Sequence, residues 1–223
     1  MDFFQKQLGA VIDVELIGDK LHTGVLVDAE HDILVVYNGE RYIYIPTYHV
    51  LNVSVSSQKS LADFSAPPEK PINNDKQISY RKILLNSKGI FSEIFVSGNQ
   101  PIHGYITHVM TNYFEFYSPV FRTMFIPLVH LKWLIPYNNY HTPYLLDKKF
   151  FPVNPSDLPL SRTFEEQIKK LEGNIVVFDL GRSSSRIGLL KAIDNNIVHM
   201  ITAEGKTYYT NIQHIKSVHS PSL

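Results

Sequence analysis

The chain has 223 residues, with 21 Lys and Arg, 21 Asp and Glu, and no cysteine. A formal net charge of zero argues against a dedicated nucleic-acid binder, which usually carries a basic excess. The lack of cysteine excludes disulfides, thiolate zinc sites and cysteine nucleophiles, and 44% hydrophobic with 19% charged residues is the composition of a folded protein.

The N-terminal segment does not resemble a secretory signal. Residues 1–10 carry Asp2 and Lys6 and lack a long apolar core. No apolar stretch approaches the roughly 20 residues that a membrane helix needs. We therefore expect a protein that is synthesised in the cytoplasm without a signal peptide and has no membrane span.

Three glycine pairs with one spacing indicate an internal repeat. In each pair the second glycine follows the first by fifteen residues, and a histidine follows the second glycine by 25 or 26. These repeat markers are Gly9, Gly24 and His49; Gly89, Gly104 and His130; and Gly173, Gly188 and His214. The spacing predicts three copies of one structural module.

Each copy has the pattern of short strands. Residues 11–16 partly alternate apolar and acidic side chains, as a half-buried strand does. Asn38-Gly39 between 33–37 and 42–45 predicts a two-residue hairpin. About five strands in each module predict a small, strongly bent antiparallel barrel. We expect the repeated glycines at barrel corners, where a side chain would obstruct the bend.

A short helix is expected before each copy, and the third is the clearest. Phe164, Ile168 and Leu171 fall at helical spacing, and Thr163 with Glu166 forms a capping box. Weaker equivalents precede the other copies, at Phe4 and Leu8 and at Ile83 and Leu84.

These patterns divide the chain into three modules and two connections. The modules span 1–57, 81–137 and 162–223. The segment 58–80 is predicted to be a linker, because it contains clustered prolines and lacks the periodic pattern of apolar residues. The segment 138–161 is an aromatic and proline-rich connection.

Aromatic residues gather between 113 and 151, which holds 12 of the chain's 27. One interpretation is that these rings pack across neighbouring modules. The other is an exposed patch for a partner protein. Under the second, the predicted contacts are Tyr137, Tyr140, Tyr144, Phe150 and Phe151.

Charge is distributed unevenly among the modules. Residues 1–56 hold three Lys and Arg against eight Asp and Glu, a net charge of −5. The net charge is +3 over 81–137 and +2 over 162–223. Modules of opposite sign can attract within one chain or between chains; the alternative is a solvated surface without a partner.

No pattern of residues indicates an enzyme. The phosphate-loop, zinc-protease, nucleophile-elbow and dinucleotide motifs are all absent. The segment 181–186, Gly-Arg-Ser-Ser-Ser-Arg, could hold a phosphate, but its alignment with the first hairpin turn of each module favours a plain surface turn. We predict no catalytic residue, no cofactor and no metal site.

The three marker histidines are predicted to have a structural role. They stand in separate modules and so cannot converge on one ion within a module. We expect their ring nitrogens to bond the backbone at the start of the last strand.

Two resemblances follow from these motifs. The run from Gly9 through Val14, Gly24 and Asp32 to His49 resembles the Sm-like fold. The segments 168–177, 187–190 and 208–218 of the third copy resemble the spore coat protein B family of endospore-forming bacteria, whose N-terminal region is described as Sm-like.

The resemblance implies a fold and a function. The fold is all-β, with three tandem Sm-like (SH3-like) five-stranded small barrels and short leading helices. The function is that of a non-enzymatic structural or assembly protein of the spore coat, acting through contacts with other coat proteins or with itself.

RNA binding is the alternative, since the Sm fold often serves it. The bacterial Sm-like RNA chaperone places a lysine directly before the aligned histidine, where this chain has Tyr48, Val129 and Gln213. The negative first module would also repel phosphates. These features make nucleic acid the less favoured partner, without excluding it.

Overall fold

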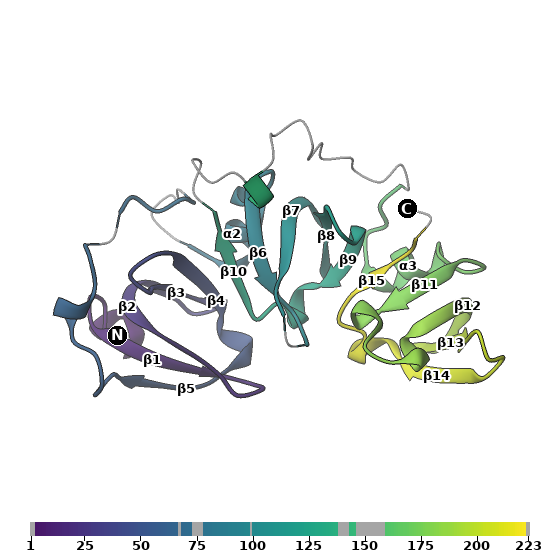
Figure 1. The fold of residues 1–223 in the computed structure, drawn as a ribbon, viewed down its shortest axis with the longest axis horizontal. Coiled ribbons are helices and arrows are strands. Elements are labelled where there is room, and N and C mark those ends of the chain that lie inside the picture. The colour runs from purple at the N-terminus through teal and green to yellow at the C-terminus, as the bar shows by residue number, and fades with distance from the viewer. Residues whose placement is uncertain are drawn as a thin grey trace.

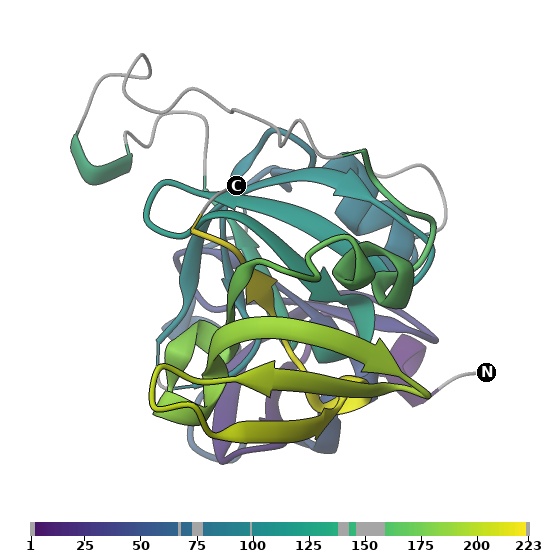
Figure 2. The same cartoon turned by 90° about the vertical axis from the view of Figure 1, so that its right-hand side faces the viewer.

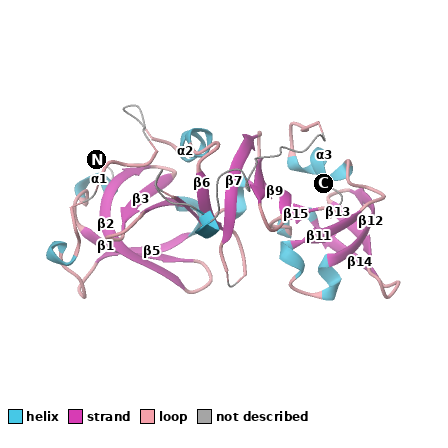
Figure 3. Cartoon of the chain, turned by 45° about the horizontal axis from the view of Figure 1, so that its top comes forward, coloured by secondary structure: helices cyan, strands magenta, loops and turns pink. Residues whose placement is uncertain are grey.

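The chain folds mainly as strands. The computed structural model describes residues 3–66, 68–72, 78–98, 100–137, 143–145 and 159–221. Within these ranges, fifteen strands form one continuous antiparallel sheet, and short helices lie beside them (Figures 1 and 3). Among the described residues, no helix has the length and apolar character needed to cross a membrane.

The sheet consists of three units with the same internal strand order. The first unit contains α1 (Phe3–Lys6), β1 (Val11–Leu16), β2 (Lys20–Glu30), β3 (Ile33–Tyr37), β4 (Tyr42–Pro46), η1 (Thr47–His49) and β5 (Val50–Val55). Its strands lie in the order β5-β1-β2-β3-β4. The fifth strand therefore lies beside the first, and the fourth strand lies at the other edge.

The second and third units repeat this order. The second contains α2 (Tyr80–Asn86), β6 (Phe91–Phe95), β7 (Ile102–Val109), β8 (Tyr113–Ser118), β9 (Arg122–Pro127), η3 (Leu128–His130) and β10 (Trp133–Pro136). The third contains α3 (Phe164–Lys169), β11 (Ile175–Phe178), β12 (Ile187–Asp194), β13 (Ile197–Ile201), β14 (Thr207–Asn211), η8 (Ile212–His214) and β15 (Val218–His219). Shorter 3-10 turns lie at η2 (Leu61–Asp63), η4 (Pro143–Leu145), η6 (Asp179–Gly181) and η7 (Ser184–Arg186).

Neighbouring units are joined edge to edge. Strand β4 pairs with β10, and β9 pairs with β15. The fourth strand of one unit thus lies beside the fifth strand of the next. The three units follow one another along an arc in Figure 1, and Figure 2 looks along that arc with the third unit in front. A single sheet therefore runs through all three units.

The second strand of each unit bends at the same place. A register shift falls two residues after the second marker glycine, at Leu26, Ile106 and Leu190. A Cβ on these glycines would lie within 2.1 to 2.3 Å of a backbone carbonyl oxygen on the facing strand; the pairs are Gly24 and Tyr37, Gly104 and Tyr117, and Gly188 and Ile201. Only glycine allows the two strands this close approach.

The first marker glycine of each unit is required for a different reason. Gly9, Gly89 and Gly173 have φ of +83°, +74° and +82°, and a Cβ there would meet no atom within 4 Å. Each follows the leading helix of its unit. Here glycine supplies the left-handed backbone that reverses the chain into the first strand.

The hydrophobic cores are shared between units. The core cluster of the first unit includes Phe95, Trp133 and Ile135 of the second. The cluster of the third unit includes Tyr113 and Phe125 of the second. Separating the units would therefore expose apolar surface at both junctions.

The structure tests two predictions about local structure. Helix α3 has both halves of the capping box between Thr163 and Glu166, as predicted. The prediction of a two-residue hairpin turn at Asn38-Gly39 is wrong, because four residues join β3 to β4. The Asn38 side chain accepts hydrogen bonds from the N–H groups of Glu40 and Arg41. This side-chain bonding makes a wider turn.

The predicted linker 58–80 is packed where it is described. Ile72 and Ile78 are buried in a core cluster that also contains residues of the first two units. Lys70 Nζ lies 2.5 Å from Asp28 Oδ2, and the Tyr42 hydroxyl donates to the Pro68 carbonyl. Loss of sequence period therefore does not mean a loose segment here.

Candidate functional site

A tryptophan of the second unit fills the first junction. The Trp133 ring stacks on Phe95, with centroids 4.1 Å apart and planes within 4°. Its Nε1–H points to Glu93 Oε1 at 3.4 Å, and Glu93 Oε2 pairs with Arg41 of the first unit at 3.1 Å. The pairing of Arg41 with Glu93 joins two units, so the sequence pattern of either unit alone does not predict it.

The two junctions share one register. At the first, Leu134 lies opposite Tyr44; at the second, Val218 lies opposite Phe125. In both cases the residue four after one unit's marker histidine faces the residue five before the preceding unit's histidine. The same strand register therefore occurs at both junctions of the chain.

The marker histidines of the first two units reach across the junctions. His49 Nε2 donates to the Val129 carbonyl at 2.6 Å, and His130 Nε2 donates to the Gln213 carbonyl at 2.9 Å. Each acceptor directly precedes the next unit's histidine. The rings do bond the backbone, but the bond joins two units instead of fixing the histidine's own last strand.

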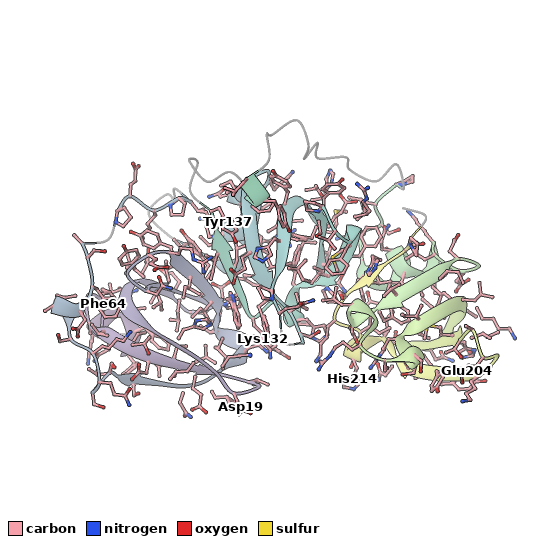
Figure 4. The ribbon with its side chains drawn as sticks, in the orientation of Figure 1. Asp19, Phe64, Lys132, Tyr137, Glu204 and His214 are labelled. Atoms are coloured by element: carbon pink, nitrogen blue, oxygen red, sulfur yellow. The ribbon has the colours of Figure 1, made fainter. Side chains whose placement is uncertain are left out.

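His214, the third marker, has no such bond. In the described ranges, no hydrogen bond to its ring is found, and the residue is exposed. Figure 4 places it on the side of the third unit that faces the second. Among the described residues, no further unit lies beside β14, the strand that precedes this histidine.

Burial sets the protonation of the two bonded histidines. Burial lowers the pKa of His49 and of His130, although the hydrogen bond to the neighbouring carbonyl acts in the opposite direction. His49 Nδ1 is buried without a hydrogen-bond partner in the described chain. Protonation would create a buried N–H donor there with no acceptor, so the neutral ring is favoured.

A lysine adds a further contact across the first junction. Lys132 Nζ donates to the Ile17 carbonyl at 2.7 Å and lies 5.6 Å from the centre of the Phe95 ring. Burial lowers the pKa of this amine, and the charges of Lys216 and Lys20 act in the same direction. Lysines from all three units therefore influence one another on this side of the sheet.

Two strands lie at the ends of the sheet with one neighbour each in the described chain. These are β5 of the first unit and β14 of the third. Every residue of β4 and β10 is buried, whereas β5 and β14 are mostly exposed. Among their exposed side chains are Leu51 at 54%, Val55 at 58% and Tyr209 at 67%.

The described aromatic side chains on the strands of the second unit, within residues 113–137, are mostly buried. Tyr113, Phe114, Phe116 and Phe125 are fully buried. These rings support the packing interpretation for the strands of the second unit.

The predicted partner contacts are divided. The Tyr137 hydroxyl shares a hydrogen bond of 3.1 Å with His103 Nδ1, and its ring packs on Phe91. Tyr144 is 52% exposed, and the centres of its ring and the Phe91 ring are 6.4 Å apart in an edge-on arrangement. Tyr140, Phe150 and Phe151 lie outside the described residues.

Buried polar groups hold the bend of the second unit. Glu115 Oε2 accepts from Thr107 Oγ1 at 2.5 Å and lies 2.7 Å from His108 Nδ1. Thr107 is the extra residue of the bulge in β7. Within the described ranges, no group of three or more potential metal ligands is found. We assign Glu115 to the bulge of β7, because its Oε2 bonds Thr107 and His108 there.

Comparison with known proteins gives the family. Residues 163–218 match the family described as the YwrJ third domain. The chain is 40% identical over 218 residues to the uncharacterized protein YwrJ of Bacillus subtilis (strain 168), which covers 96% of this chain and 97% of that protein. The chain belongs to the YwrJ family. The family's third-domain match lies within the predicted third module, 162–223, and spans α3 to the start of β15.

Proposed function

We propose that this member of the YwrJ family is a non-enzymatic assembly protein that joins copies of itself head to tail. In the assembly, β14 of one copy lies beside β5 of another. The supporting observation is the repeated junction. The chain pairs a fourth strand with a fifth strand twice, and leaves one strand of each kind unpaired at its ends. Unpaired edges are the sites where sheets add strands.

The internal junctions specify the contacts between copies. The shared register places Val53 of one copy opposite Tyr209 of the other, since these residues lie four after and five before their histidines. The His214 ring then donates to the Tyr48 carbonyl of the second copy, as His49 and His130 do to theirs.

The two free edges suit each other chemically. Both expose apolar side chains that pairing would cover. The first unit carries a net charge of −5 and the third a net charge of +2. Head-to-tail contact therefore brings opposite charges together, which favours encounter and orientation.

A closed pair is the assembly that the curvature favours. The units follow an arc in Figure 1, and two such arcs joined at both ends make a ring of six units. Contacts of this heterologous kind close when the rotation between units allows it, and otherwise grow into filaments.

Each unit is interpreted as a small Sm-like barrel. The strand order with the fifth strand beside the first, and the bent second strand, support this interpretation. From the resemblance to the spore coat protein B family, we propose that the assembly forms part of the spore coat.

The mass of the full chain in solution tests the assembly. We expect twice the chain mass of 25.6 kDa for the unaltered protein and the single-chain mass for Tyr209→Lys, because a charge on the edge opposes pairing. Val120→Lys is the matched control, since Val120 is 65% exposed and lies outside both edge strands. A monomeric unaltered protein, or equal effects of both variants, would contradict the proposal.

A fluorescent fusion followed through sporulation of the host tests the location. A ring or cap around the forespore is expected. A diffuse signal would remove the coat assignment and leave self-assembly to be judged by mass alone.

A further inference from the structure

A cationic pocket lies at the junction of the second and third units. It has a volume of about 380 Å³, and its lining includes Arg182, Arg186, Lys216, His130, His214 and Asp179. These side chains come from the turn between β11 and β12, from the segment around η8, and from the second unit. We infer that this pocket binds the phosphate group of a small molecule.

Positive charge dominates the lining. Three permanent cations face one carboxylate. Asp179 Oδ1 already accepts from the backbone N–H groups of Lys216 at 2.7 Å and Ser217 at 3.3 Å. Its Oδ2 lies 3.5 Å from Arg186 Nη1. Three cations against this one carboxylate leave the pocket lining with a net positive charge.

One guanidinium nitrogen at the pocket lacks a hydrogen-bond acceptor among the described residues. Arg186 Nη1 is buried and has no hydrogen-bond acceptor among the described residues, despite its ion pair with Asp179. Buried donors normally find an acceptor. A phosphate oxygen in the pocket would provide one, and guanidinium groups match phosphate geometry well.

The backbone of the turn has the form of an anion site. Asp179, Leu180 and Gly181 all have positive φ, at 50°, 60° and 68°. Arg182 follows with φ −57° and ψ −18°. A change from left-handed to right-handed backbone turns successive N–H groups to one side, which forms an anion-binding concavity. Two consecutive non-glycine residues with positive φ mark this turn as a strained and specialised segment.

Other elements add positive charge nearby. The charge of Lys216 acts on Lys132 and on His130, lowering the pKa of both in addition to the effect of burial. A bound dianion would relieve the repulsion among these groups.

The repeat supplies an internal comparison. The positions aligned with Arg182 are Gly18 and Gly98, and those aligned with Arg186 are His22 and Ile102. The arginine pair is therefore specific to the third unit. Arg182 also reaches toward the matching turn of the second unit, where its Cδ lies 4.0 Å from the Cβ position of Gly98. The site depends on both units and is complete within one chain.

Calorimetric titration of the full chain tests the site. The probes are inorganic phosphate, adenosine monophosphate and oligo-U. We expect phosphate and the mononucleotide to bind, and binding to weaken about tenfold or more in Arg182→Gln and in Arg186→Gln, through loss of a charged hydrogen bond. Lys191→Gln is the control, because Lys191 is exposed on β12 and does not line the pocket.

Comparing the three probes distinguishes a site for small phosphate compounds from a site for RNA. Arg182 is exposed, so its variant is expected to fold even if Arg186→Gln does not. Binding of oligo-U without phosphate or the mononucleotide would overturn the small-molecule site and favour RNA binding. Binding of no probe, or equal weakening in Lys191→Gln, would also overturn the inference.

Discussion

The internal junctions and the free ends of the sheet are formed by equivalent strands, the fourth and fifth of each unit, which are paired at the junctions and unpaired at the ends. Phe125 and Tyr209 both stand five residues before a marker histidine. Phe125 is fully buried opposite Val218, whereas Tyr209 is 67% exposed. The difference shows that burial at these positions comes from the next unit and not from the strand itself.

The histidines show the same contrast. His49 and His130 each donate to a carbonyl of the following unit, while His214 is exposed. A third, intermolecular junction would give His214 the partner that the other two have. If so, the free end strands pair between copies in the same way as the fourth and fifth strands pair within the chain.

The largest difference is expected in stability. Phe125→Ala should lower the free energy of unfolding by about 3–5 kcal/mol, because it opens a cavity at a fully buried junction. Tyr209→Ala, at the matching exposed position, should change it by less than about 0.5 kcal/mol in the monomer. Urea unfolding of the two variants measures this. Equal losses would mean that the positions are not equivalent.

Charge exchange across the free edges tests their register. Tyr209→Lys and Val53→Asp should each weaken assembly, and an equimolar mixture of the two variants should associate again. Opposite charges on directly facing strand positions contribute about 0.2–1 kcal/mol relative to alanine. The register control is Thr210→Lys mixed with Val53→Asp, which should recover less. Equal recovery in both mixtures would contradict the stated register.

A pH dependence should follow from the two bonded histidines. Burial lowers the pKa of His49 and His130 in the folded state below the unfolded value of about 6.5. The unfolded chain therefore takes up protons first as the pH falls. Their stabilising contribution is complete above about pH 6.5 and is lost as the pH falls through the folded-state pKa.

This dependence can be isolated in a monomeric background. In Tyr209→Lys, the free energy of unfolding should fall between about pH 7 and pH 5 more steeply than when His49→Gln and His130→Gln are added. Glutamine keeps a donor for the carbonyl and does not titrate. Parallel curves would show that these rings do not carry the effect.

The smallest effect on stability and assembly is expected for a substitution outside both the internal junctions and the free end strands. Tyr144→Ala should change stability by less than about 0.5 kcal/mol, since the side chain is 52% exposed. It should leave the assembled mass unchanged. Loss of assembly in this variant would return the interface to the aromatic segment predicted from sequence.

The sequence was sufficient for the repeat and insufficient for the junctions. Spacing alone located Gly24, Gly104 and Gly188, whose role is set by the next strand of the same unit, thirteen residues later in the chain. The bond from His49 to Val129 joins residues 80 positions apart. Such contacts depend on how whole units dock, which local periodicity does not encode.

The sequence suggested only one part of the cationic pocket. The segment 181–186 could hold a phosphate, but its alignment with the hairpin turns of the other units favoured a plain surface turn. Lys216 and His130 reach the same pocket from a later segment and from another unit. Only the tertiary arrangement brings these cations together.

The most direct test of the account is a crosslink between the free edges. The chain has no cysteine, so in a variant carrying Val53→Cys and Tyr209→Cys every disulfide involves the introduced residues, and the two single-cysteine variants measure any pairing of like positions. Facing strand positions meet the Cα separation that a disulfide needs. We predict a covalent dimer under non-reducing denaturing conditions, and much less in a control with Leu51→Cys and Tyr209→Cys. A variant that stays monomeric, or that crosslinks as readily in the control, would contradict head-to-tail assembly in this register.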